Sequence, residues 1–207
     1  MQNSWMLKRC AIMAASLLML AAGLVQASEE DRKAELATEV VHDLAEIPEQ
    51  GIPPALLSNA HAIAVIPRVI KAGLIFGGRY GNGLLVVRDQ DGRWSSPSFV
   101  NIYGGSFGLQ IGVSSTDVLL VFKDSKSVED IIDGKVTLGA DAAVAAGPVG
   151  RSAEAATDAQ LEAEVYSYSR SRGLFAGVSL EGAVLQIDDE SNSRFYGRNI
   201  TCLLYTS

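Results

Sequence analysis

The chain has 207 residues and a formal net charge of −7, with 24 Asp and Glu against 17 Lys and Arg. Hydrophobic residues make up 48% of the chain, which is enough for a packed core and excludes a wholly disordered protein. The acidic balance also excludes nucleic acid as a partner, because neutralising phosphates requires a surplus of Lys and Arg. The length predicts one domain.

Both ends of the chain differ in character from its centre. Residues 1–27 place Lys8 and Arg9 before an apolar run that ends in a small-residue cleavage pattern. This order predicts a secretory signal peptide, with export to a periplasm or cell envelope. An uncleaved membrane anchor is the alternative interpretation. Residues 202–207, CLLYTS, match the translation of a sequencing adapter, so we expect the domain to be truncated at its C-terminus.

The segment 28–60 is predicted to be helical. Ser28 and Asp31 stand at the spacing of a capping box, and apolar residues then recur at helical spacing until Pro48. These features predict an amphipathic helix over 29–47 with a mainly acidic polar face. A turn and a short helical piece follow it.

From His61 onward the pattern becomes that of strands, and we expect a β-rich domain over 61–201. Alternation over 107–114 predicts a strand, with a turn at 115–117. The polar run 187–197 predicts another turn. Together the elements predict an α+β fold, a curved antiparallel β-sheet or barrel-like sandwich with a few packed helices.

One short pattern, G-L-x-x-G, occurs three times, at 73–77, 108–112 and 173–177. Glycine inside a strand marks a bend, a bulge or a close backbone approach, so the repetition favours a curved sheet. These glycine-rich stretches do not predict a nucleotide site. They lack the lysine of a phosphate-binding loop, and strand follows where such a loop requires a helix.

Catalytic and metal-binding patterns are not found in the sequence. The two histidines, His42 and His61, have no second histidine or cysteine at ligand spacing, and no G-x-S-x-G elbow is present. We therefore expect no metal, no cofactor and no enzymatic activity.

Basic residues lie beside the glycine-rich stretches of this acidic chain. Guanidinium and ammonium groups next to open backbone amides form a plausible phosphate site. The alternative is that they are solvated charges at strand ends, which carry little information. The residues selected on this basis are Lys71, Arg79, Arg151, Arg170 and Arg172.

A family resemblance rests on linked motifs. The stretch GADAAVAAGPVGR, followed by YSYSRSRGLFAGVSLEGAVL, resembles the SYLF domain family, and the order of the earlier segments fits it as well. The resemblance covers roughly residues 47–197. It implies a non-catalytic lipid-binding module. Eukaryotic members bind phosphoinositides, and some act together with actin-regulating partners.

We therefore expect a phospholipid-binding module of the bacterial cell envelope. The selected basic residues would meet phosphate head groups, and Leu174 and Phe175 would make the apolar contact with lipid. Expected partners are membrane phospholipid and an envelope protein, whereas actin-related partners are not expected for an exported lone domain. The alternative function is a structural or protein-interaction module of the periplasm without lipid affinity.

Overall fold

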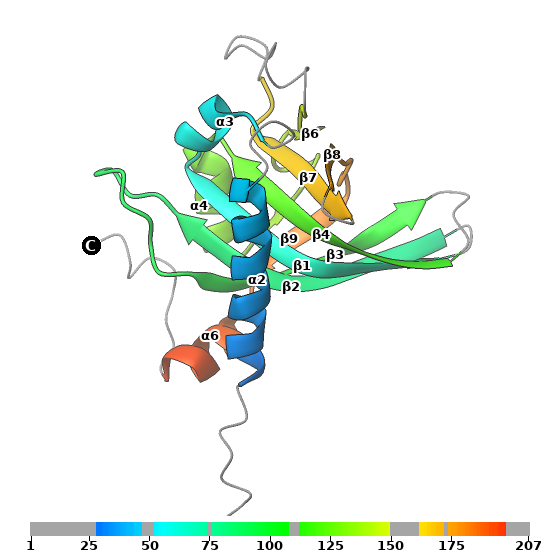
Figure 1. Ribbon diagram of the computed structural model, residues 1–207, viewed down its shortest axis with the longest axis horizontal. Coiled ribbons are helices and arrows are strands. Elements are labelled where there is room, and N and C mark those ends of the chain that lie inside the picture. Colours follow the sequence, from blue (N-terminus) through cyan, green and yellow to red (C-terminus); the bar gives the residue numbers. More distant parts are fainter. Residues whose placement is uncertain are drawn as a thin grey trace, which may run out of the picture.

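Figure 1 shows the computed structural model of the chain. The structure describes residues 28–46, 52–73, 76–107, 112–149, 162–171 and 174–197. The expected signal peptide at 1–27 and the terminal segment 202–207 lie outside the described residues. Both stay predictions, as does the division of the domain at residue 61.

The described strands form one sheet with the order β5-β9-β3-β2-β1-β4-β7-β6, and β8 pairs with β7. All pairs are antiparallel except β6 with β7. The strands are β1 (Ala62–Gly73), β2 (Phe76–Val87), β3 (Ser98–Phe107), β4 (Gly112–Phe122), β5 (Lys135–Thr137), β6 (Val144–Ala146), β7 (Val165–Ser171), β8 (Leu174–Gly177) and β9 (Ala183–Ile187). The helices are α2 (Glu29–Glu46), α3 (Pro54–Ser58), α4 (Ser125–Ile132) and α6 (Asp189–Tyr196). The predicted α+β class with a curved antiparallel sheet is confirmed.

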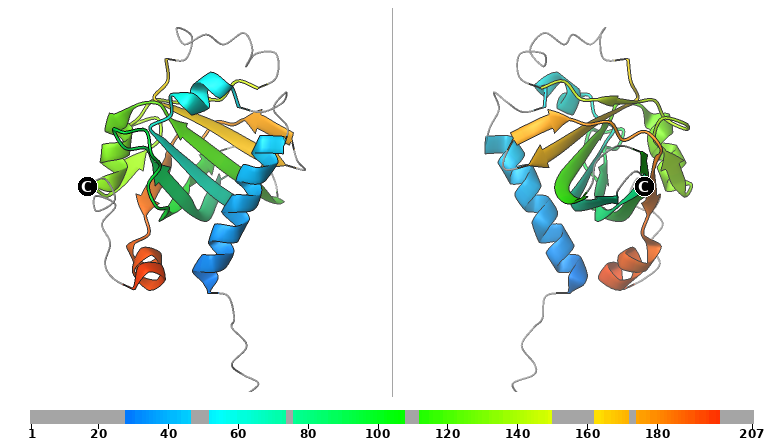
Figure 2. Two further views of the ribbon diagram at one scale, coloured as in Figure 1. Left: turned by 60° about the vertical axis from the view of Figure 1, so that its left-hand side comes forward. Right: turned by 90° about the vertical axis from the view of Figure 1, so that its right-hand side faces the viewer.

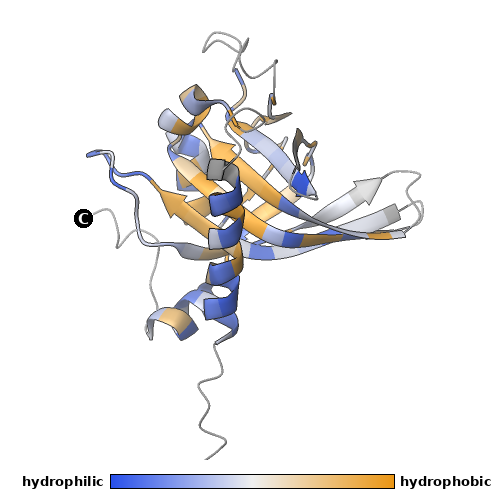
Figure 3. Ribbon diagram, viewed as in Figure 1, coloured by the Kyte–Doolittle hydropathy of each residue, from blue (hydrophilic) through white to orange (hydrophobic). Residues whose placement is uncertain are grey.

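Helix α2 confirms the predicted amphipathic helix and its capping box. The Asp31 backbone N–H donates to the Ser28 hydroxyl over 3.0 Å, and the Ser28 N–H donates to the Asp31 carboxylate over 3.0 Å. Ala37 and Val40 on its apolar face are buried against the sheet. The helix crosses β1 and β2 on the outer face of the curl, where orange strands underlie a mostly blue helix (Figure 3).

The start of α2 is fastened to α6 by an ion pair. The Arg194 Nε lies 2.8 Å from Oε1 of Glu30, a carboxylate that is itself buried. This hydrogen bond holds the pKa of Glu30 below its ordinary value, although desolvation opposes the shift. Two helices far apart in the sequence are thereby held side by side.

The sheet curls because β1 bulges where it passes β2. The register between the two strands shifts between Val65 and Ile70, and within this bulge Arg68 adopts a φ of 52°. Gly81 and Gly83 of β2 lie against the bulge, and a Cβ on Gly83 would stand 2.1 Å from the carbonyl oxygen of Val65. The curl that results is visible in the right-hand view of Figure 2.

Each face of the curled sheet carries its own core. The inner core includes Ile66, Val69, Leu85, Ile102, Val118, Leu120 and Phe122, and Val128 and Ile131 of α4 close it from one side. The outer core lies beneath α2 and α3 and includes Ala37, Val40, Leu56, Val65, Leu119, Val121, Tyr166 and Tyr168. Residues of one strand alternate between the two cores, as the period of a strand requires.

The motifs that carry the family resemblance pack against each other over the outer core. A Cβ on Gly147, in the GPVG stretch, would stand 2.0 Å from Cζ of Tyr168. A Cβ on Gly177, in the GLFAG stretch, would stand 2.4 Å from the carbonyl oxygen of Gly147. Small residues are therefore needed here to let three segments of chain stack closely.

The predicted turn at 115–117 is wrong, because these residues lie inside β4. Thr116 pairs with Val69 and Ser115 with Ile70. Residues 108–111 of the strand predicted over 107–114 lie outside the described residues, and on either side of them β3 ends at Phe107 and β4 begins at Gly112. Polar residues in β4 resemble a turn in the sequence, but here they occupy the part of the strand that extends beyond the core.

The predicted turn at 187–197 is also wrong, because this run contains α6. Asp188 caps the helix by accepting a hydrogen bond of 3.0 Å from the Ser191 backbone N–H. Gly197 ends it in the left-handed region, with a φ of 69°. The buried Asn192 then ties the helix to β3, since its side-chain oxygen accepts from the Phe99 N–H over 2.8 Å.

The three G-L-x-x-G stretches occur where β1 meets β2, β3 meets β4, and β7 meets β8. The ends of β1, β2, β3 and β4 that adjoin the first two stretches extend past the helices, toward the right of Figure 1. β3 and β4 are not paired with each other, because β2 and β1 lie between them in the sheet. We call this part of the sheet the projecting end. It comprises the described residues 70–73, 76–80, 103–107 and 112–116.

Candidate functional site

The projecting end brings together two of the basic residues selected from the sequence. Lys71 of β1 and Arg79 of β2 are direct partners in the antiparallel register, so their side chains leave the same face. Arg79 alternates with the buried Gly81, Gly83 and Leu85, which places the pair on the inner face of the curl. Two cationic side chains this close on one face can contact the same anion.

Hydrogen bonds within the described residues compensate the charge of Arg79 only in part. Its Nη1 donates to the carbonyl oxygen of Ser179 across the curl over 3.4 Å. Its Nε is buried and has no hydrogen-bond partner among the described residues. Burial lowers the pKa of Arg79 from its ordinary value, because the charged form is partly desolvated. A guanidinium in this state is suited to receive an anionic oxygen.

The outer face of the projecting end is apolar and exposed. Ile70 and Tyr80 are register partners with exposed fractions of 50% and 52%. Val113, at the start of β4, is 78% exposed. Large apolar side chains with this exposure on one face mark a surface for contact with another molecule.

Acidic residues are missing from the sequence of the strand segments that form the projecting end. The chain has 24 Asp and Glu, yet none occurs from Gln50 to Arg88 or from Gly92 to Thr116. Arg68, Lys71 and Arg79 lie within the first of these stretches. The projecting end is thus locally basic in an acidic protein, and it would attract an anionic partner.

Arg170 lies elsewhere and is engaged within the protein. Its Nε and Nη2 stand 2.9 Å and 2.8 Å from Oδ2 of Asp117 on the neighbouring strand. Its other amino group forms an ion pair with Asp43 of α2. The Arg170 side chain is only 12% exposed, and it leaves the outer face rather than the inner one. We therefore leave Arg170 out of the site proposed below.

The remaining selected residues are not placed by the structure. Arg151 and Arg172 lie outside the described residues. Leu174 and Phe175 belong to β8, where their backbones pair with Ser171 and Arg170 of β7, but their side chains lie outside the description. These four assignments stay predictions.

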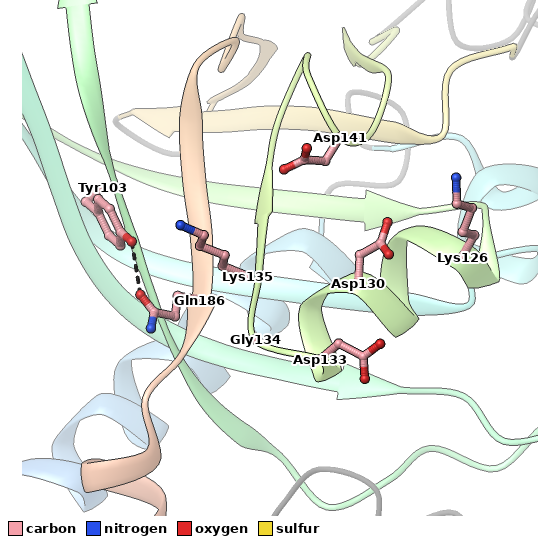
Figure 4. Close-up of a pocket in the computed structure, with 8 residues that line it drawn as sticks. All are labelled: Tyr103, Lys126, Asp130, Asp133, Gly134, Lys135, Asp141 and Gln186. Carbon is pink, nitrogen blue, oxygen red and sulfur yellow. Dashed lines mark hydrogen bonds between the residues drawn. The ribbon is translucent and has the colours of Figure 1, made fainter.

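A second feature is a hollow of about 770 Å³ beside α4 and β5 (Figure 4). It is lined by Tyr103, Lys126, Asp130, Asp133, Gly134, Lys135, Asp141 and Gln186. The Tyr103 hydroxyl donates to Oε1 of Gln186 over 3.0 Å. Lysines stand among aspartates around the rim, so opposite charges offset one another and produce no strong field for an ion.

The sequence interpretation missed Ile70, Tyr80 and Val113. Alternation alone does not tell which end of a strand extends beyond the core, so it did not show that these side chains are exposed. The gaps in the distribution of Asp and Glu were the available signal, and they cover β1, β2, β3 and the start of β4.

Among the described residues, no group of three or more His, Cys, Asp and Glu is placed to hold a metal ion. Within the same ranges, no helix combines the length and the apolar character needed to cross a bilayer.

Comparison with known proteins identifies relatives of the domain. Residues 103–203 match the family Ysc84, described as "Las17-binding protein actin regulator". Protein YSC84 of Saccharomyces cerevisiae is 43% identical over 162 residues, which cover 77% of this chain and 34% of that protein. LAS seventeen-binding protein 3 of the same yeast is 42% identical over 162 residues, covering 77% and 35%. SH3 domain-containing YSC84-like protein 1 of Homo sapiens is 37% identical over 174 residues, covering 81% and 51%.

These relatives correct one expectation and confirm another. Actin-related partners were not expected for this chain, and that expectation is wrong. The family description and the name of the second yeast relative point to Las17 binding and actin regulation. The relatives are eukaryotic and give no support to a role in a bacterial envelope. The chain spans about a third to a half of the length of these curated relatives. The chain belongs to the Ysc84/SYLF family, as the linked glycine motifs indicated.

Proposed function

We propose that the domain is a non-catalytic module that binds anionic phospholipid through its projecting end. The observation that carries the proposal is the cross-strand pair of Lys71 and Arg79 on the inner face of the curl. Two cations held opposite each other, one of them partly buried with an unpartnered Nε, fit a phosphate group. The lipid-binding character implied by the family resemblance supports the same conclusion.

The two cations would act differently. Arg79 is fixed by its bond to the Ser179 carbonyl, so its remaining donors present a planar fork to the phosphate oxygens. Lys71 lies one strand away and adds a compact charge on a flexible stem. The pair is brought together only in the folded chain, so ligand binding is also expected to stabilise the fold.

Replacing both Lys71 and Arg79 by alanine is expected to weaken binding to anionic vesicles by roughly thirtyfold, since each cation near such a surface contributes about 1 kcal/mol. Co-sedimentation with vesicles of mixed phosphatidylcholine and phosphatidylserine measures the change. Arg93→Ala is the matched control, because Arg93 is an exposed cation on a different hairpin. Equal binding by the double variant and the native protein would contradict the proposal.

A soluble ligand separates head-group recognition from membrane contact. Calorimetric titration with glycerophosphoinositol phosphates is expected to show binding to the native protein and none to the Lys71→Ala/Arg79→Ala variant. Adding salt should weaken this binding steeply, because the contact is between charges.

A second candidate function rests on the family description alone. We propose that the chain also contributes to actin regulation through a protein partner, in keeping with relatives named for binding Las17. Co-sedimentation with actin filaments in the absence of lipid tests this directly. If the protein, at micromolar concentrations, stays in the supernatant when the filaments pellet, this second candidate function is wrong. The phospholipid proposal does not depend on that result.

A further inference from the structure

We propose that the projecting end enters the interfacial region of an anionic bilayer tip first, with its outer face in contact with lipid chains. This inference rests on the proposed phospholipid function and specifies the surface that penetrates. Its partner is a lipid bilayer that carries negative charge. The residues that carry it are Ile70, Tyr80 and Val113.

The outer face of the projecting end is arranged in two rows across the strands. The first row pairs Ile70 with Tyr80 and, on the next strand, Tyr103. The second row lies nearer the projecting ends of the strands. In it Val113 of β4 pairs with Ala72 of β1, and Ala72 pairs with Gly78 of β2. Rows two residues apart on a strand are separated by about 7 Å.

The two rows differ in their distance from the projecting tip and in the size of their side chains, and this difference indicates which row enters the bilayer first. Along β1, Ala72 follows Ile70 toward the hairpin connection, so the second row is the more distal one. The distal row is the flatter one, because Gly78 and Gly105 oppose each other within it. Val113 is therefore the only bulky side chain among the described residues of that row, and it is exposed on nearly all sides. Among the described residues, a tip-first approach would bring Val113 deepest and leave Ile70 and Tyr80 nearer the head groups.

The composition of the projecting end fits a lipid surface better than a protein groove. Tyrosine combines an apolar ring with a polar hydroxyl, and such residues are enriched where membrane meets water. Tyr80 and Tyr103 occupy the row that the geometry places at this level. The absence of Asp and Glu from the strand segments of the projecting end removes the repulsion that anionic lipid would otherwise exert.

The inner and outer faces then contact different parts of the same bilayer. Lys71 and Arg79 adjoin Ile70 and Tyr80 along their strands, and therefore lie at the same level as the first row. At that level the inner face meets phosphates, while the distal row of the outer face reaches the start of the acyl chains. Both contacts require that these strand ends project from the domain, as they do in Figure 1.

Serine substitutions test the outer face. Ile70→Ser and Val113→Ser are each expected to weaken vesicle binding by about tenfold, because they remove apolar surface that would be buried in lipid. Both should leave titration with the soluble head group unchanged. Val41→Ser is the matched control, since Val41 is 47% exposed on α2, away from the projecting end. A loss of vesicle binding in Val41→Ser alone would overturn the proposal and assign the contact to the helix.

A tryptophan probe measures depth directly, and Trp5→Phe together with Trp94→Phe first removes both tryptophans of the chain. In that background, Val113→Trp and Ile70→Trp are compared in vesicles with lipids brominated at different acyl positions. Quenching at both sites, reaching deeper bromines for residue 113, is the expected result. Equal shallow quenching, or none, would overturn the tip-first geometry.

The two proposals fail separately. If the soluble head group binds but neither tryptophan is quenched, the phospholipid function stands and the inferred insertion is wrong. If neither vesicles nor head groups bind, the phospholipid function fails and the insertion fails with it.

Discussion

Gly83→Ala is expected to lower the free energy of unfolding by about 3 kcal/mol, because the new methyl group has no space to occupy. Its Cβ would stand 2.1 Å from the carbonyl oxygen of Val65 and 2.6 Å from Cα of Ile66. Both atoms belong to the backbone of β1, so a side-chain rotation cannot relieve the overlap. The bulge would have to move, and the curl of the sheet would move with it.

Thermal and urea unfolding measure this effect, which corresponds to a fall in melting temperature of roughly 10 °C. Gly105→Ala is the matched control in the next strand, because a Cβ there meets no described atom within 4 Å. The control should be neutral or slightly stabilising, since alanine costs less backbone entropy than glycine. Equal stability of the Gly83 and Gly105 variants would refute the role given to the close approach of β1.

Arg170→Met is expected to cost about 3 kcal/mol of stability, because it leaves the carboxylate of Asp117 charged and largely buried without its partner. The side chains of Arg170 and Asp117 are 12% and 16% exposed. Methionine keeps the apolar stem, so the loss reports the charge contacts rather than packing. The contact with Asp43 is lost at the same time, and the end of α2 is released from the sheet.

A double-mutant cycle separates this effect from a general loss of packing. Asp117→Asn in the Arg170→Met background removes the stranded charge and should recover part of the lost stability. Arg93→Met is the exposed control, since its ion pairs with Asp89 and Asp91 lie in solvent, and no measurable change is expected. An Arg170→Met variant as stable as the native protein would show that the pair contributes nothing. Lipid binding by Arg170 variants should be interpreted only alongside their stability.

Local signals in the sequence predicted local structure well. Helix α2 was predicted within one residue at its C-terminal end, because its capping box and apolar spacing are properties of adjacent residues. The same kind of signal was present for α6, where Asp188 and Gly197 mark its two ends. It was overlooked because the run between them is polar, and α6 buries mainly the polar Ser191 and Asn192.

The site depends on relations that only the fold creates. Lys71 and Arg79 were selected because they stand near glycines, but their direct pairing follows from the register of β1 with β2. Arg170 looked equally suitable in the sequence. Its partners Asp43 and Asp117 lie far away along the chain, so nothing local revealed that its charge is already used. Glycine motifs likewise predicted curvature, whereas the bulge at Arg68 that directs it became visible only in three dimensions.

The strand order also bears on how the chain is synthesised. The central strands β3, β2, β1 and β4 come from residues 62–122, whereas β9 and β7, which flank them, begin only at Ala183 and Val165. At a translation rate of about 5–20 residues per second, the nascent chain carries an uncovered β4 for several seconds. That strand ends in the apolar run VLLVF, a sequence suited to pairing with other chains. Production of this domain should therefore depend on chaperones that shield this edge until β7 emerges.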